Sequence, residues 1–127
     1  WLHSYFYTKK DFQQSLDIMN QLNVTCHLYR PPWGHMNLFT YHFMKKHQLK
    51  LCLWNVMIQD WKNQSKSLLK ERLIKQCHSN SIICLHDSSH DCGADYGAPL
   101  NTIGALELAI PQLKIKGLKF ISLERSQ

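Results

Sequence analysis

The feature that most constrains the fold is a regular alternation of helix-like and strand-like segments along the 127 residues. Apolar residues recur at helical spacing in 9–22, in 38–47, in a segment that begins at Ser65 or Ser67 and ends before Ser79, and in about 101–116. Short strand-like runs follow at 24–29, 50–56, 81–85 and 118–123. Such an order predicts right-handed crossovers and a parallel α/β sheet, built as one domain over 1–127.

Capping and breaking residues predict where the segments end. Thr8 is a candidate N-cap for the first helix and Asn37 for the second. The pair Pro31-Pro32 stops regular structure after the first strand. Pro111 is expected to kink or break the last helix, and Gly117 to cap it.

Composition excludes several classes of protein. Hydrophobic residues make up 44% of the chain, and the longest apolar run is far too short to span a membrane. The net charge of +6 lies mainly in the first half, on helices without interleaved aromatic residues, so we expect a solvated face rather than nucleic-acid binding. Five cysteines without a C-x-x-C pair indicate neither a disulfide framework nor a thiolate zinc site, and they weakly favour a reducing, cytoplasmic compartment.

Chemically active residues follow three of the predicted strands, at the carboxyl ends where parallel sheets carry their sites. They stand in Arg30-Pro31-Pro32-Trp33-Gly34, in Gln59-Asp60-Trp61 and in His86-Asp87. The two prolines stiffen the backbone beside Arg30, so its guanidinium can be aimed at a carboxylate. The next backbone N–H is that of Trp33, which can serve an oxyanion. An ordinary turn with a surface arginine is the alternative.

The other two motifs are weaker when taken alone. Asp60 could supply a carboxylate and Trp61 an aromatic wall for a sugar ring, although an aspartate in that place often begins a turn. His86 is suited to proton transfer near neutral pH, although a histidine in an apolar strand is more often structural. A metal site formed by His86 and Asp95 with the segment 90–92 is disfavoured, because all its ligands would come from one loop.

Taken together, these motifs resemble the C-terminal part of a polysaccharide deacetylase domain, the NodB-homology group that includes chitin and peptidoglycan deacetylases. Arg30 to Gly34 resembles the third motif of that family, Asp60-Trp61 the end of the fourth, and Ile82 to Asp87 the fifth. Residues 102–120 resemble its closing helix and strand. The resemblance implies a distorted (β/α) barrel that hydrolyses the acetamide C–N bond of N-acetylated sugars.

The resemblance also implies roles for individual residues. His86 would be the general acid and Leu85 would line the pocket for the acetyl methyl group. Arg30 would hold the carboxylate of the general base, the Trp33 amide would bind the oxyanion, and Trp61, next to Asp60, would form a wall of the substrate groove. In the family a divalent metal, often zinc, polarises the carbonyl.

The chain departs from the family pattern where the metal should bind. It has no Asp-Asp pair, its only candidate for the H-x-x-x-H motif is His3 to Tyr7, and Met57 stands where the fourth motif usually opens with an aspartate. We therefore expect a fragment of a longer enzyme, inactive alone, whose metal-binding motifs lie upstream of Trp1; no signal peptide can be read in the chain. The alternative is a carbohydrate-binding or structural module in which Trp33, Trp54 and Trp61 stack on sugars. The family is commonly exported to the cell envelope, against the weak cysteine signal, so the compartment stays open.

Overall fold

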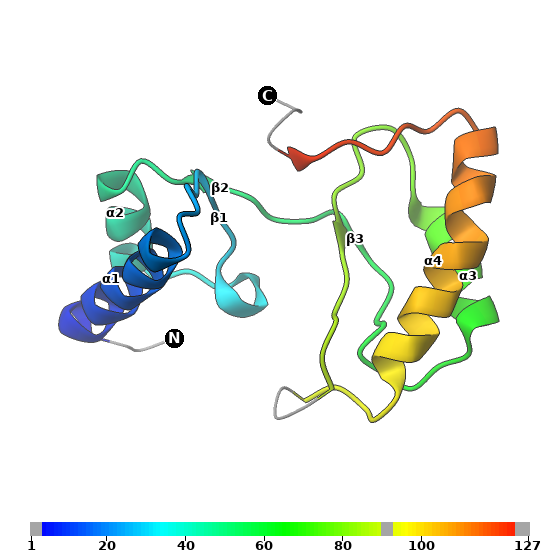
Figure 1. Ribbon diagram of the computed structural model, residues 1–127, viewed down its shortest axis with the longest axis horizontal. Coiled ribbons are helices and arrows are strands. Elements are labelled where there is room, and N and C mark those ends of the chain that lie inside the picture. The colour runs from blue at the N-terminus through cyan, green and yellow to red at the C-terminus, as the bar shows by residue number, and fades with distance from the viewer. Residues whose placement is uncertain (1–3, 90–92, 124–127) are drawn as a thin grey trace. The chain divides into compact units, whose positions relative to one another are not determined.

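The computed structural model describes residues 4–89 and 93–123, which form two compact units (Figure 1). The first unit ends at Leu53 and the second begins at Trp54. Each unit has its own hydrophobic core and its own pair of parallel strands, so each is described by itself. The parallel pairing predicted from the sequence is confirmed in both units.

The first unit begins with helix α1 (Tyr5–Gln21). Its N-cap is Ser4, whose hydroxyl oxygen accepts a hydrogen bond from the Tyr7 N–H, so the prediction that Thr8 caps this helix is wrong. Thr8 lies inside the first turn and is buried, and its hydroxyl donates to the Ser4 carbonyl. Serine and threonine can both cap a helix, and here the cap is Ser4, the earlier of the two in the chain.

The rest of the first unit holds two short strands and one further helix. Strand β1 (Leu28–Tyr29) leads into a 3-10 turn (Pro32–Gly34), and helix α2 (Leu38–Lys46) is followed by strand β2 (Lys50–Leu51). The predicted cap Asn37 is confirmed, because its side-chain oxygen accepts from the Thr40 N–H at 2.8 Å. The core consists of Phe12, Phe43, Met44 and Leu49, with the Tyr29 ring stacked on Phe12.

The second unit contains strand β3 (Val56–Met57), helix α3 (Lys66–Gln76), strand β4 (Ile83–Cys84) and helix α4 (Ala98–Ile115). The predicted single strand over 50–56 is therefore wrong, because this apolar run supplies two strands. The Cys52 N–H donates to the Tyr29 carbonyl in the first unit, whereas the Val56 N–H donates to the Ile82 carbonyl in the second. An apolar pattern alone does not reveal where a run changes its partner.

Helices α3 and α4 pack against each other and against β3 to form the core of the second unit. Leu69 and Leu73 are fully buried on α3, and α4 faces them with a stripe that includes Ala105, Ala109 and Leu113. The small alanines allow close approach of the helices, and full burial of each leucine contributes roughly 1.5–3 kcal/mol. This packing holds α4 in place, the helix that supports the candidate site.

Helix α4 differs from its prediction at its start and at Pro111, whereas the predicted cap Gly117 is confirmed. It begins at Ala98 and continues through Pro111 to Ile115, so the expected break at the proline does not occur. Its end is a Schellman motif: Gly117 has a φ of +84°, and the Leu118 N–H donates to the Leu113 carbonyl. Leu118 then packs against the core, and the described residues after it, through Leu123, include no strand, contrary to the prediction for 118–123.

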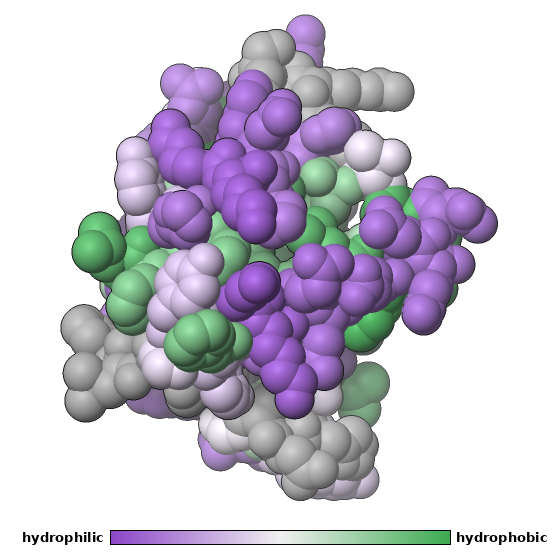
Figure 2. Space-filling view, turned by 90° about the vertical axis from the view of Figure 1, so that its left-hand side faces the viewer, coloured by the Kyte–Doolittle hydropathy of each residue, from purple (hydrophilic) through white to green (hydrophobic). Residues whose placement is uncertain are grey.

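The surface agrees with a water-exposed chain of mixed polarity. In the view of Figure 2 hydrophilic residues cover much of the face, and apolar residues appear between them as smaller patches. Within 4–89 and 93–123, no helix combines the length and the apolar character that crossing a membrane requires.

Candidate functional site

The centre of the candidate site is a pair formed by Asp60 and His86, which follow strands β3 and β4. The Asp60 side chain is fully buried, and one carboxylate oxygen lies 3.0 Å from His86 Nδ1. Its other oxygen accepts the His86 backbone N–H at 2.7 Å. Because a carboxylate can only accept, Nδ1 carries the ring proton and Nε2 faces away from Asp60. The His86 side chain remains 39% exposed, so the imidazole can be reached from solvent.

Several neighbours hold this pair in place. The Thr102 hydroxyl on α4 lies 3.4 Å from Asp60 and 3.2 Å from the Ala98 carbonyl. Gln59 has a φ of +59°, a left-handed conformation that is costly for a residue with a side chain, directly before Asp60. The Arg72 guanidinium donates to the Ile58 carbonyl at 2.8 Å. Sequence reasoning missed these supports, since none of them carries a motif.

Trp61 and Leu85 lie beside the pair. The Trp61 and His86 rings meet edge to face, with centroids 5.3 Å apart and an interplanar angle of 80°. Leu85 is partly buried and packs against the core of the second unit, which leaves only part of its side chain accessible. Four predicted site residues, Asp60, Trp61, Leu85 and His86, therefore belong to the same unit.

Arg30 and Trp33 belong to the first unit, and their predicted convergence with His86 stays a prediction. The Arg30 Nε donates to the Cys52 carbonyl at 3.2 Å, and Nη2 lies 3.5 Å from the Leu53 carbonyl. These bonds tie the guanidinium to the end of β2 and restrict where it points. The carbonyls that constrain Arg30 belong to Cys52 and Leu53, directly after β2, and the prediction that the guanidinium is aimed at a carboxylate stays a prediction.

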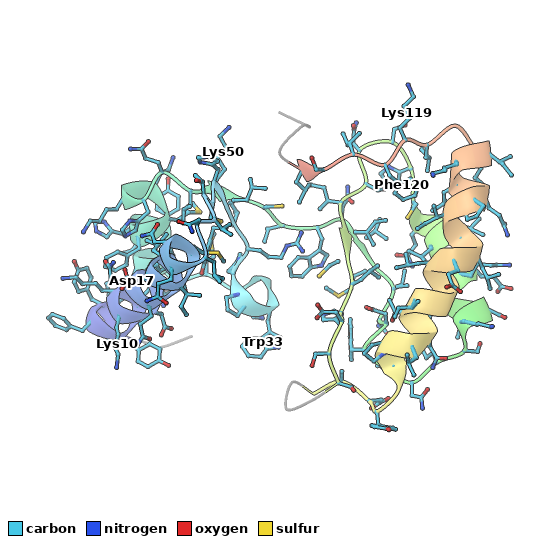
Figure 3. All side chains as sticks on the ribbon, in the orientation of Figure 1. Lys10, Asp17, Trp33, Lys50, Lys119 and Phe120 are labelled. Carbon is cyan, nitrogen blue, oxygen red and sulfur yellow. The ribbon has the colours of Figure 1, made fainter. Side chains whose placement is uncertain are left out.

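The turn that contains Trp33 is a rigid, exposed feature. Trp33 has a φ of +52° and its residue is 84% exposed, so the strain is not offset by burial of the indole (Figure 3). The turn is closed by the Gly34 N–H on the Pro31 carbonyl and the His35 N–H on the Pro32 carbonyl. Neither bond uses the Trp33 amide. Strain of this kind is typical of backbone held in place for a ligand.

A groove of about 790 Å³ lies beside this turn within the first unit, and Arg30 and Trp33 both line it. Its other walls include Asp11 of α1 and Tyr29 of β1. Burial raises the pKa of the Tyr29 hydroxyl, and the negative charge of Asp11 raises it further. The groove thus holds a neutral hydrogen-bonding phenol near neutral pH.

The described residues do not fit a metal. Among 4–89 and 93–123, no three histidine, cysteine or acidic side chains gather as a metal site would require. The carboxylate of Asp95, considered above as a ligand, instead accepts the Asn63 N–H at 2.8 Å. His90, Asp91 and Cys92, and the candidate ligand His3, lie outside the described residues. We therefore derive no step that passes through a metal.

Comparison with known proteins identifies the relatives of this arrangement. No family model matches the chain. It is 29% identical over 97 residues to a peptidoglycan-N-acetylglucosamine deacetylase of Bacillus cereus, an alignment that covers 75% of this chain and 42% of the relative. It is 27% identical, over 91% of its length and 18% of the relative, to a bifunctional xylanase/xylan deacetylase of Cellvibrio japonicus. This chain is related to the polysaccharide deacetylases.

Solved structures of deacetylases share the fold. A peptidoglycan N-acetylglucosamine deacetylase superposes with a TM-score of 0.83 over 96% of this chain and 55% of its own, at 22% identity. A pseudoenzyme of the CE4 family from Bacillus anthracis superposes with a TM-score of 0.78 over 93% of this chain and 38% of its own, also at 22% identity. The predicted fold class, part of a deacetylase-type α/β fold, is confirmed.

The deacetylase-like chain spans less than half the length of these two curated relatives. Both an enzyme and a pseudoenzyme share its fold, so the fold alone leaves activity open. The activity and substrates of the complete protein are therefore questions for the site.

Proposed function

We propose that this chain carries the proton-donating part of a polysaccharide de-N-acetylase, which hydrolyses the acetamide C–N bond of N-acetylated sugars. The observation that carries the proposal is the buried Asp60 carboxylate bonded to both His86 Nδ1 and the His86 N–H, while the ring stays partly exposed. The name of the Bacillus cereus relative, a peptidoglycan-N-acetylglucosamine deacetylase, agrees with this chemistry, and that of the xylan deacetylase agrees with removal of an acetyl group from a polysaccharide.

In the proposed reaction water adds to the acetamide carbon, the C–N bond breaks, and the amine leaves with a proton from His86 Nε2. Acetate and a free amino sugar are the products. Asp60 orients the imidazole through its bond to Nδ1, as general acid catalysis requires. Trp61 offers a flat apolar face to a sugar ring beside the imidazole.

The first unit would contribute Arg30 and the Trp33 amide in the roles that the resemblance implies: the guanidinium would orient the base carboxylate, and the amide would stabilise the oxyanion. The metal dependence of the complete protein is likewise a proposal. Its ligands would lie outside the described residues, and no step above depends on them.

The test is a His86→Gln substitution in the complete protein, assayed by acetate release from an N-acetylated chitooligomer. We expect kcat to fall by roughly 10²–10⁴, because the general acid is lost, while oligomer binding changes little. His78→Gln is the matched control, since His78 is an exposed histidine of the same unit whose Nδ1 lies against the Ser79 carbonyl. Unchanged turnover in His86→Gln would rule out the acid role.

The second candidate is a sugar-binding module without catalysis. It is favoured by the lack of a metal-binding group among the described residues and by the likeness to a pseudoenzyme. Under this alternative, Trp61→Ala in the complete protein would weaken oligomer binding, and the unsubstituted protein would release no acetate with any added divalent metal.

A further inference from the structure

The loop after β4 reaches back to the loop after β3 through Asp95, a residue to which the proposed mechanism gives no role. The Asp95 N–H donates to the Trp61 carbonyl at 2.8 Å, and the Asp95 carboxylate accepts the Asn63 N–H at 2.8 Å. The two bonds join segments more than thirty residues apart in sequence and fall on either side of Lys62. They hold the backbone of Trp61 and Asn63 against the loop after β4. We call these two bonds the Asp95 clasp.

The clasp is also tied to helix α4. The Ala98 N–H, in the first turn of α4, donates to the Asp95 carbonyl at 3.1 Å. The Asn101 amide of the same helix donates to the Asn63 side-chain oxygen at 2.9 Å. One helix therefore supports the loop of Trp61 through Asp95 and Asn101, and it supports Asp60 through Thr102.

The local sequence is suited to this geometry. Asp95 lies between Gly93 and Gly97, whose φ angles are +77° and +80°. Such values favour glycine, and no atom approaches the position that a Cβ would occupy at either residue. The two glycines are therefore suited to their positive φ angles and not to close packing. These backbone angles give the loop the course that brings Asp95 to Trp61.

We propose that Asp95 is a positioning residue that holds the Trp61 indole against the His86 imidazole and so fixes the wall of the sugar-binding groove. The inference deepens the proposed function and rests on it only for the catalytic consequence. The position of the indole depends on two rotatable side-chain bonds and on the position of the Trp61 backbone, and the clasp holds that backbone in place. Without it the edge-to-face contact at 5.3 Å would not persist.

The structural test uses nuclear Overhauser contacts between the ring protons of Trp61 and His86, measured on this chain. We expect them at full strength in the unsubstituted chain and in Asp95→Asn, which keeps an acceptor oxygen. We expect them to weaken in Asp95→Ala, which removes the acceptor of the Asn63 N–H but keeps the backbone bond from the Asp95 N–H to the Trp61 carbonyl. Glu107→Ala, which removes an exposed carboxylate from α4, is the matched control and should retain them at full strength. Contacts as strong in Asp95→Ala as in the unsubstituted chain would overturn the proposal.

Hydrogen exchange of the Asn63 amide in the unsubstituted chain keeps the test decisive if Asp95→Ala fails to fold. The amide should exchange slowly, and exchange at the rate of a solvated loop would overturn the clasp without any variant. In the complete protein Asp95→Ala should raise KM for the chitooligomer roughly three- to tenfold with a smaller change in kcat. Weaker ring contacts together with an unchanged KM would contradict the proposed function of Trp61 but not the clasp itself.

Discussion

At the scale of single residues, the decisive feature is the set of donors that surrounds the Asp60 carboxylate. The carboxylate is buried and accepts from His86 twice, with the Thr102 hydroxyl as a further neighbour. The sequence placed Asp60 and His86 at the ends of strands, but it left open whether Asp60 begins a turn. Asp60 does lie in a turn, which the Lys62 N–H closes on the Gln59 carbonyl at 3.2 Å, and its carboxylate is nevertheless bonded to His86. Neither the left-handed Gln59 nor the approach of Thr102, 42 residues further along the chain, has a local signal.

Asp60→Asn should therefore act on both stability and the protonation of the ring. An amide has one acceptor oxygen where the carboxylate has two, so we expect a loss of about 1–3 kcal/mol in the free energy of unfolding. The remaining good arrangement puts the amide N–H on His86 Nδ1, which moves the ring proton to Nε2. Urea denaturation measures the first effect, and imidazole ¹⁵N shifts measure the second.

Asp17→Asn is the matched control for this experiment, because Asp17 lies on the exposed face of α1 and accepts only from Gln13 one turn earlier (Figure 3). Its effect should stay within about 0.5 kcal/mol. If Asp60→Asn were equally mild and left the ring proton on Nδ1, the carboxylate would not be what fixes the tautomer.

The Tyr29 hydroxyl gives a prediction for pH dependence. Its pKa is raised above the usual value of 10, first by burial and then by Asp11. A group with a raised folded pKa contributes stability below its unfolded pKa and loses it as the pH rises through the folded pKa. The first unit should thus weaken above about pH 10, where an unfolded tyrosine ionises.

Asp11→Asn should lower the pKa of Tyr29 without returning it to 10, since burial is the larger cause. The alkaline loss of stability should shrink accordingly. Absorbance at 295 nm, taken as the difference from Tyr29→Phe, reports the titration. A pKa that rises in Asp11→Asn would show that another charge dominates this side of the groove.

At the scale of elements, the sequence predicted types better than boundaries. The predictions of helix α2 and of its cap Asn37 were correct, because a single asparagine directly precedes a clear apolar pattern. The apolar run of 50–56 was misread as one strand, because it supplies two sheets. The ends of α1 and α2 fall close to their predicted places, and the left-handed Asn23 agrees with asparagine as a helix stop, whereas the positive φ of Gln48 had no sequence signal.

Pro111 is the sharpest conflict between sequence and structure. It lies in the fourth turn of α4, removes the N–H that would bond to the Glu107 carbonyl, and is exposed. The buried Ala109 and Leu113 on either side keep the helix continuous. Tertiary packing therefore outweighs a local cost of about 3 kcal/mol.

Pro111→Ala should raise the free energy of unfolding by about 1–3 kcal/mol, because it restores a backbone hydrogen bond and removes a clash. Thermal unfolding followed by circular dichroism measures the change. Gln112→Ala, at the next exposed position, should change stability by less than about 0.5 kcal/mol. A destabilised Pro111→Ala would mean that the proline contributes a contact of its own.

At the scale of the whole molecule, the residues to which the proposal gives roles are divided between two separate units: Arg30 and Trp33 belong to the first, and Asp60, Trp61 and His86 to the second. In neither unit do the described residues include three or more histidine, cysteine or acidic side chains gathered closely enough to hold a metal ion. The resemblance assigns roles to residues of both units, and the convergence of these residues stays a prediction. Sequence motifs identify which residues could have catalytic or binding roles more readily than they predict how those residues are arranged in space.

The 127-residue chain, purified alone and mixed with zinc and an N-acetylated chitooligomer, should release no acetate above the blank. His86 and Asp60 can supply and orient a proton, but protonating the amine contributes only roughly 10²–10⁴ to the rate and does not by itself activate water. The complete protein, assayed beside it with and without a chelator, is the positive control. Zinc-dependent acetate release by the isolated chain would show that it contains the metal ligands, and loss of that release in His86→Gln would still leave the acid role intact.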